Sequence, residues 1–172
     1  MLACAPVERG LTAEQARQVI ETGEAAAAQL RERLAGRLTT AIQADGPAAA
    51  IDVCANEALA LTREIAAGAG AGFELKRTSI RVRNPLNAPD SLVQQALAWF
   101  AGEIAAGRAV PTHYLQAESE RNHRYYAPLR ITTLCIQCHG PADRIDAMSA
   151  ACSLSATRRT RLLDTSRVTC AG

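Results

Sequence analysis

The sequence predicts an α+β fold in which long helices precede a small antiparallel sheet. Two long segments in the first half carry apolar residues at helical spacing, whereas three later segments have the character of strands. The 172 residues are the length of one domain, and they are 48% hydrophobic but only 3% aromatic. We therefore expect a core built mainly from Ala, Leu, Ile and Val. The formal net charge of +2 argues against a nucleic-acid-binding protein, and no apolar run approaches the length of a membrane span.

The first helix should begin near Ala13, because Thr12 and Gln15 have the spacing of a capping box. Gly46 and Pro47 should end it. Its apolar stripe continues through four residues spaced by four, namely Leu30, Leu34, Leu38 and Ile42.

A second helix is predicted after this break, and a third after a turn at residues 84–89. The second carries apolar residues spaced by three and four, which places Cys54 on its buried face; the set is Ile51, Cys54, Ala58, Leu61 and Ile65. Asp90 can cap the third helix. The apolar stripe of that helix is Val93, Leu97, Phe100 and Ile104.

The strand-like segments are residues 77–83, 110–117 and 123–131. In the first, Thr78, Ile80 and Val82 alternate with polar residues. The other two flank a polar turn at residues 118–122 and predict an antiparallel hairpin. Tyr125 and Tyr126 alternate along the second of them, so one should face the interior, or a bound cofactor, and the other solvent.

Cys135, Cys138 and His139 form a CxxCH sequence, with Gly140 directly behind it. In c-type haem attachment, two thiols add across the haem vinyl groups and the adjoining imidazole binds the iron, which requires this spacing. The motif therefore predicts one covalently bound haem c.

Three other interpretations of the motif fit the sequence less well. A thioredoxin-like redox pair needs a βαβ context, which is missing, and does not need the His. A zinc site could recruit Cys152 and Cys170, but these two residues do not form a second closely spaced pair. A structural disulfide across two residues would close a strained loop and contribute little stability.

A low-spin haem iron needs a second axial ligand, and the sequence leaves three candidates. Cys54 is a capable thiolate ligand, although a buried Cys alone is more often a small core hydrophobe. His113 and His123 are the alternatives. Met1 is terminal and Met148 lies just beyond the attachment motif, so neither competes.

The strand around residue 80 is strongly basic, with Lys76, Arg77, Arg81 and Arg83 in eight residues. Such a run is most often a solvated face. Alternatively, one or two of its Arg residues neutralise haem propionates, because a guanidinium matches a carboxylate in a bidentate pair. Tyr125 and Tyr126 likewise have core packing or haem contact as possible roles.

Several stretches together resemble a known family. They are Cys54 in Ile-Asp-Val-Cys, residues 77–85 with Asn87 and Pro89-Asp90, residues 125–129, and residues 135–140. They resemble the bacterial single-haem c-type family of PAS-like fold, long catalogued as a domain of unknown function, over roughly residues 11–147. The resemblance implies haem bonded to Cys135 and Cys138, with His139 and the Cys54 thiolate as axial ligands. An anionic thiolate should favour ferric iron and a low reduction potential.

The two ends of the chain depart from this pattern. Residues 1–10, with Met1-Leu2-Ala3-Cys4, look like a leader remnant or a lipoprotein-like N-terminus in which Cys4 receives the lipid. Residues 11–150 form the predicted haem domain. Residues 151–172 form an atypical tail, where a frameshift would leave the last strand of the sheet missing. The attachment chemistry and Cys4 both predict the periplasm, with lipid anchoring as an option.

Two functions follow from these residues. The first is single-electron transfer or redox reporting, with a redox protein as partner. The second is a gas or redox sensor in which a diatomic ligand displaces Cys54, which a PAS-like fold favours only by analogy. A small peroxidase is disfavoured, because no distal His and Arg pair can be placed.

Overall fold

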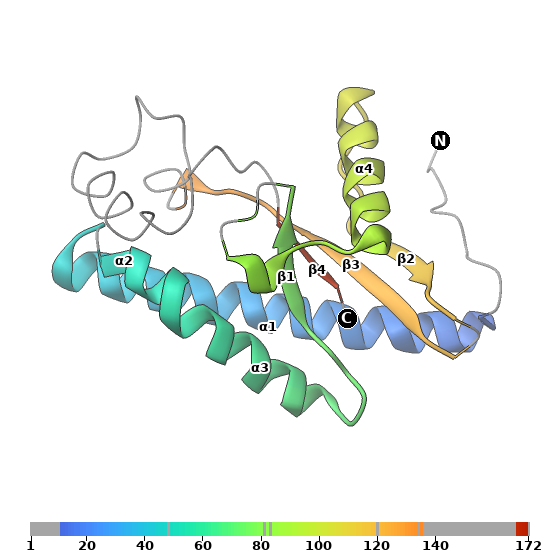
Figure 1. Cartoon of the computed structure of the whole chain (residues 1–172), viewed down its shortest axis with the longest axis horizontal. Helices are drawn as coiled ribbons and strands as arrows, with labels where there is room; N and C mark the ends of the chain where they lie inside the picture. The colour runs from blue at the N-terminus through green and yellow to red at the C-terminus, as the bar shows by residue number, and fades with distance from the viewer. Residues whose placement is uncertain are drawn as a thin grey trace.

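The fold is α+β, as predicted, with a long N-terminal helix and a small antiparallel sheet (Figure 1). The computed structural model describes residues 11–47, 49–80, 82, 84–119, 121–133, 135 and 168–171. The elements are α1 (Ala13–Asp45), α2 (Ala49–Asp52), η1 (Val53–Glu57), α3 (Ala58–Ala69), β1 (Lys76–Ser79), η2 (Pro85–Asn87), α4 (Ser91–Ala105), β2 (Tyr114–Ala117), β3 (His123–Leu129) and β4 (Val168–Ala171).

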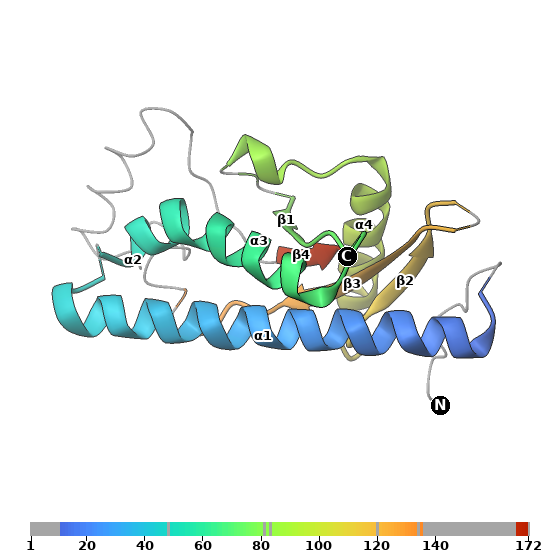
Figure 2. The same ribbon diagram turned by 90° about the horizontal axis from the view of Figure 1, so that it is seen from below.

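Helix α1 begins and ends where the sequence predicts. The Thr12 side chain accepts a hydrogen bond from the Gln15 backbone, and the Gln15 side chain accepts one from the Thr12 backbone. The helix ends at Asp45, and Gly46 follows with a φ of 80°. Seen from below, the helix runs the length of the molecule, with α2, η1 and α3 folded back along it (Figure 2). It buries Leu30 and Leu34 of the predicted stripe.

Elements α2, η1 and α3 follow one another without a gap, and η1 is a π-helical turn. A π-turn contains more residues than an α-turn, so it changes which residues face inward. Val53 and Ala58, five residues apart, are buried, whereas Cys54 is only half-buried. Cys54 is thus partly covered, as are Ile51 and Leu61 of the predicted stripe, while Val53 takes the fully buried position in the π-turn.

The sheet contains four strands in the order β1-β4-β3-β2, and every pairing is antiparallel. The atypical tail thus supplies β4, which lies between β1 and β3, so the expectation of a missing last strand is wrong. The hairpin of β2 and β3 is confirmed, with its turn closed by a hydrogen bond from Glu118 N to Asn122 O of 2.9 Å. Its strands are shorter than the predicted residues 110–117 and 123–131.

Both faces of the sheet are covered by helices. Tyr125 packs with Ala27 of α1 on one face, and Tyr126 packs with Phe100 of α4 on the other. The two tyrosines are only 3% and 0% exposed, so the prediction that one of them faces solvent is wrong. Core packing is the role that the structure gives to both. The predicted cap of α4 is confirmed, since Asp90 Oδ1 accepts from Val93 N at 2.9 Å.

The predicted strand at residues 77–83 ends earlier than its alternation suggests. Strand β1 stops at Ser79, and Ile80 is exposed. The chain then turns back at η2, where the Asn84 side chain accepts a hydrogen bond from Leu86 N. Among the described residues, no helix is both long and apolar enough to cross a membrane.

Candidate functional site

Two of the predicted functional segments leave the sheet at the same end. Ser79, the last residue of β1, lies opposite Val168 of β4, and Val168 also lies opposite Leu129, the last residue of β3. Neighbouring strands are about 4.8 Å apart, so Ser79 and Leu129 are separated by roughly 10 Å. Two segments therefore start close together: the basic segment that begins at residue 80 and contains Arg81 and Arg83, and the chain that leads to Cys135.

This end of the sheet points toward α2. In both views the segment after β3 runs to the part of the molecule where α2 lies (Figures 1 and 2). It ends in a turn, in which Cys135 N donates to Thr132 O at 3.0 Å and Cys135 Sγ lies 3.4 Å from Thr132 Oγ1. Cys135 is half-buried. Cys138 and His139 lie outside the described residues.

Cys54 lies in the π-turn at this same end of the molecule. The wide turn is closed by a hydrogen bond from Ala58 N to Val53 O. Its last residue, Glu57, accepts from Arg37 of α1, with Arg37 Nε 2.8 Å from Glu57 Oε2. Packing of Val53 and Ala58 against Leu34 fixes the inner side of the turn. The half-buried Cys54 thiol is thus carried by a turn that is attached to α1 on two sides.

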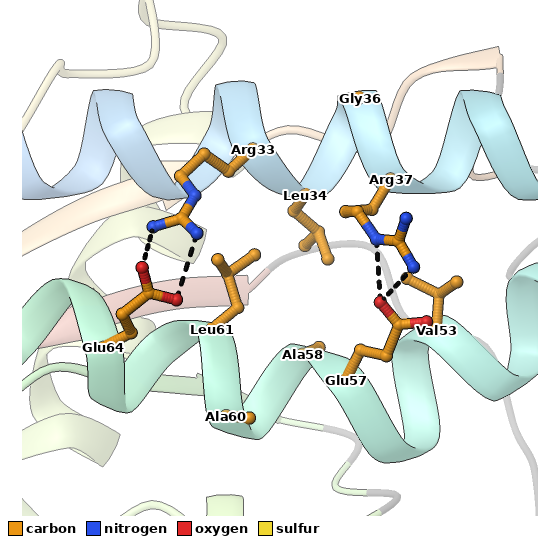
Figure 3. Close-up of a pocket in the computed structure, with 10 residues that line it drawn as sticks. All are labelled: Arg33, Leu34, Gly36, Arg37, Val53, Glu57, Ala58, Ala60, Leu61 and Glu64. Atoms are coloured by element: carbon orange, nitrogen blue, oxygen red, sulfur yellow. Dashed lines mark hydrogen bonds and ion pairs between the residues drawn. The ribbon is translucent and has the colours of Figure 1, made fainter.

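A cleft of about 510 Å³ lies between α1 and α3, beside the turn (Figure 3). Two ion pairs cross it, Arg33 with Glu64 and Arg37 with Glu57. The apolar residues among those that line it are Leu34, Val53, Ala58, Ala60 and Leu61. Cys54 is not among its lining residues, so this cleft adjoins the predicted ligand and does not contain it.

Arg77 lies on the face of the sheet that α1 covers. In antiparallel strands, residues opposite one another project to the same face. Arg77 is opposite Cys170, which is opposite Ala127, and Ala127 packs with Ala27 of α1. The Arg77 side chain is half-buried. The other two predicted propionate-binding residues, Arg81 and Arg83, lie outside the described residues.

The two histidine alternatives lie far from the π-turn. His113 stacks on Tyr125, with ring centroids 5.5 Å apart, and Tyr125 packs near Gly23 of α1. The turn instead packs at Leu34, about 16 Å further along that helix at 1.5 Å per residue. His123 begins β3, roughly 20 Å from the end that leads to Cys135. His123 therefore lies at the opposite end of β3 from Cys135. His113 directly precedes Tyr114, which is opposite Tyr126, and it is separated from the π-turn by the distance along α1.

Tyr126 stands in a buried polar network on the α4 side of the sheet. Its hydroxyl donates to Gln116 Oε1 at 2.9 Å, and Gln116 Nε2 donates to Gln95 Oε1 at 3.1 Å. Burial, partly opposed by the Arg124 guanidinium, raises the pKa of Tyr126 to about 12. The phenol is therefore held neutral, as a core residue with its polar atom satisfied.

Sequence reasoning missed the contacts that hold this site in shape. Thr78 Oγ1 donates to Asn87 O at 2.8 Å, and Lys76 Nζ donates to Ala88 O at 2.6 Å, so the chain after β1 is tied back to the strand. The Arg37–Glu57 pair was missed as well. The Asn84-Pro85 turn is the local sequence sign that the chain after β1 folds back. Nothing in the sequence indicates the Arg37–Glu57 pair.

The described residues contain no group of three or more His, Cys, Asp or Glu side chains placed to hold a metal ion. The zinc alternative depends on Cys152, which lies outside the described residues, and on Cys170, of which only the backbone in β4 is described.

The comparisons agree with this architecture. No curated protein matches the chain. A solved structure, the crystal structure of the cyanobacterial heme-protein Tll0287, is similar with a TM-score of 0.61 and 19% sequence identity. The similarity covers 94% of this chain and 95% of that one, and at this identity it shows a shared fold. Residues 9–154 match the Tll0287-like family. The chain therefore belongs to the Tll0287-like family.

Proposed function

We propose that this protein binds one haem c covalently and uses it for single-electron transfer or redox reporting. The observation that carries the proposal is the register of the sheet, which starts the basic segment and the CxxCH segment roughly 10 Å apart, at the end where Cys54 lies. The cyanobacterial relative of the same fold is itself a heme-protein.

The residues at this end of the sheet fit a covalently bound haem. Cys135 and Cys138 would each add a thiol S–H across a vinyl C=C bond, which forms two thioethers and releases nothing. His139 would bind the iron on the side of the attachment, and the Cys54 thiolate on the other. Cys54 is favoured over His113 and His123 because its turn lies at this end of the molecule.

Arg77 would face the propionates from the α1 side of the sheet, with Arg81 and Arg83 following it in the sequence. Tyr125 and Tyr126 would support the strand that carries the attachment segment rather than touch the cofactor, since both are packed against helices. When bound, haem supplies a centre that accepts or releases one electron. A Cys54 thiolate bound to the iron would keep the reduction potential of the haem low.

A gas or redox sensor is the second candidate, and the π-turn favours it. Such turns inside α-helices are frequent at functional sites, and this one carries Cys54. Release of Cys54 would open an iron position for a diatomic ligand. Attachment chemistry supports a periplasmic location as part of this proposal, and the Cys4 sequence supports a lipid anchor there.

Spectra of haem-loaded protein test the proposal. We expect haem to stay with the chain after acid-acetone extraction, and a low-spin thiolate signal in electron-paramagnetic spectra. Cys54→Ala should abolish that signal, whereas Cys170→Ala should keep it. A signal that survives in Cys54→Ala would remove Cys54 as a ligand, and loss of all pigment on extraction would refute covalent binding.

Carbon monoxide separates the two candidates. An electron carrier with two firmly bound axial ligands should keep its six-coordinate spectrum when the reduced protein is exposed to the gas. A sensor should instead form a carbon monoxide complex, with Cys54 displaced.

A further inference from the structure

The chain between β1 and α4 forms a loop with a fixed base. Thr78 is 2% exposed, and its hydroxyl donates to Asn87 O at 2.8 Å. Lys76 Nζ donates to Ala88 O at 2.6 Å. Asn87 N also donates to Asn84 O at 2.8 Å within the turn. These bonds hold residues 84–88 against β1 and so fix the chain on which Leu86 lies. The segment of residues 80–86 is here called the basic loop.

The basic loop presents two large apolar side chains to the surface. Ile80 is 68% exposed and Leu86 is 66% exposed, and they are the exposed large hydrophobic residues of the described part of the chain. Covering either side chain would remove a large apolar surface from water, which is favourable. A loop with a fixed base that leaves both of them uncovered is suited to covering something else.

The position of the loop indicates what it covers. Ile80 directly follows Ser79, which lies in one row with Val168 and Leu129, and Cys135 is six residues beyond Leu129. In both views η2 lies in the half of the molecule that contains α2 and η1 (Figures 1 and 2). A porphyrin tethered at Cys135 has a large apolar surface and two carboxylates, and the basic loop offers apolar and cationic side chains together.

We propose that Ile80 and Leu86 form an apolar cover over the haem, positioned by Thr78 and Lys76. This inference rests on the proposed haem binding. The apolar shell around a redox centre limits its contact with water and thereby tunes its reduction potential. Ile80 and Leu86 would be binding residues, whereas Thr78 would be a positioning residue that acts through the loop.

The sign of the effect follows from charge. With a thiolate ligand, the ferric haem core is neutral and the ferrous core is an anion. Water stabilises an anion more than a neutral group. Removal of the cover should therefore favour the ferrous form and raise the reduction potential. With two neutral axial ligands, the ferric core is a cation and the shift has the opposite sign.

The test uses full-length protein with covalently attached haem. The double variant Ile80→Ser/Leu86→Ser should show a raised midpoint potential relative to Ala98→Ser, which alters an exposed apolar residue of α4. Thr78→Val removes the hydroxyl that holds the loop and should shift the potential in the same direction. Thr78→Ser keeps the hydroxyl and should restore the parent value.

A shift of either sign in the double variant supports the cover, and a lowered potential would point to a neutral ligand in place of Cys54. The inference is overturned if the double variant keeps the potential of Ala98→Ser while its haem stays attached and low-spin. If Thr78→Val does not fold, the double variant still decides, because its two positions are exposed. Failure of the proposed haem binding is distinguished from failure of the cover, because in the first case the parent protein itself retains no haem.

Discussion

The ring of Tyr125 occupies the space that a side chain on Gly23 would need. A Cβ atom added to Gly23 would lie 2.4 Å from both Cγ and Cδ1 of Tyr125. Gly23 is buried in α1, so the absence of a side chain lets β3 approach the helix closely. The contact fixes β3, the strand that leads to Cys135, against α1, on which the turn of Cys54 packs.

Gly23→Ala should destabilise the protein, because the ring is packed between helix and sheet and cannot move away. Overpacking of this kind costs about 1–3 kcal/mol, and it should exceed the roughly 0.5–1 kcal/mol that Ala gains over Gly in a helix. Urea unfolding measures the difference. Gly36→Ala is the matched control on the same helix, since nothing lies within 4 Å of its added Cβ. That variant should be stabilised, and equal effects at the two positions would contradict the packing argument.

The inner strand β4 should be essential to the sheet, since it pairs with both β1 and β3. Thr169 lies opposite Thr78 on one side and Pro128 on the other. Thr169→Pro removes a backbone donor, and leaving one buried backbone group unpaired costs about 1–3 kcal/mol. We expect a lower free energy of unfolding, because the ends of β1 and β3 would separate. Thr169→Val keeps the donor and should unfold like the parent.

The neutral phenol of Tyr126 should make stability depend on alkaline pH. Burial raises its pKa from 10.0 to about 12 in the folded state. The folded state therefore binds the proton more tightly, so its contribution is complete below pH 10 and is lost as the pH rises towards 12. The loss should amount to at most about 3 kcal/mol. Unfolding free energies measured from pH 8 to pH 12 should fall less steeply for Tyr126→Phe than for the parent.

Asp90 should matter both as a helix cap and as a charged partner. Its Oδ1 accepts from Val93 N at 2.9 Å, and its Oδ2 accepts from Arg124 Nη1 at 2.6 Å. Partial burial raises the pKa of Asp90, but the bonds from Arg124 and Val93 outweigh it, and the net pKa is lowered. Its contribution is therefore present above the ordinary Asp pKa and is lost as the pH falls below it.

Loss of this cap in Asp90→Ala should cost about 1–2 kcal/mol at pH 7. Asp90→Asn keeps the acceptor for Val93 and should lose much less. Chemical unfolding of both variants at pH 7 and at pH 3 separates the roles, because only the charge responds to acid. Equal losses in Ala and Asn variants at pH 7 would show that the ion pair, rather than the cap, carries the stability.

The sequence predicts the elements whose signals are local. The capping box at Thr12 and the cap at Asp90 are set by side chains three residues from their partners, so both helix starts are confirmed. The hairpin turn is local as well. The strand boundaries were placed less well, because alternation continues through Ile80 and Val82 after the pairing of β1 with β4 has ended at Ser79.

Features that depend on distant pairing escaped prediction. Nothing around Val168 shows that it will lie between Ser79 and Leu129, since both partners are far away in the chain. The π-turn escaped as well, because apolar spacing assumes 3.6 residues per turn, and the fully buried position there belongs to Val53 rather than Cys54. For the site, the chemical groups were visible in the sequence, whereas the contacts that hold them were not.

The Arg37–Glu57 ion pair should control the turn that carries Cys54, if Cys54 binds the iron as proposed. Arg37→Met removes the anchor of the last residue of η1, so the turn can rearrange more readily (Figure 3). Stability should change by no more than about 1 kcal/mol, because the pair is exposed to solvent. The low-spin thiolate signal should weaken, and the reduced protein should bind carbon monoxide to a greater extent.

Arg33→Met is the matched control. Arg33 of α1 pairs across the same cleft with Glu64, which lies in the regular helix α3 rather than in the π-turn. Both variants lose one exposed ion pair between α1 and the helix beside it, so a general loosening of that interface would affect the haem equally in both. A change confined to Arg37→Met would instead assign the effect to the π-turn. Identical spectra and identical carbon monoxide binding in the two variants would show that Glu57 does not position Cys54.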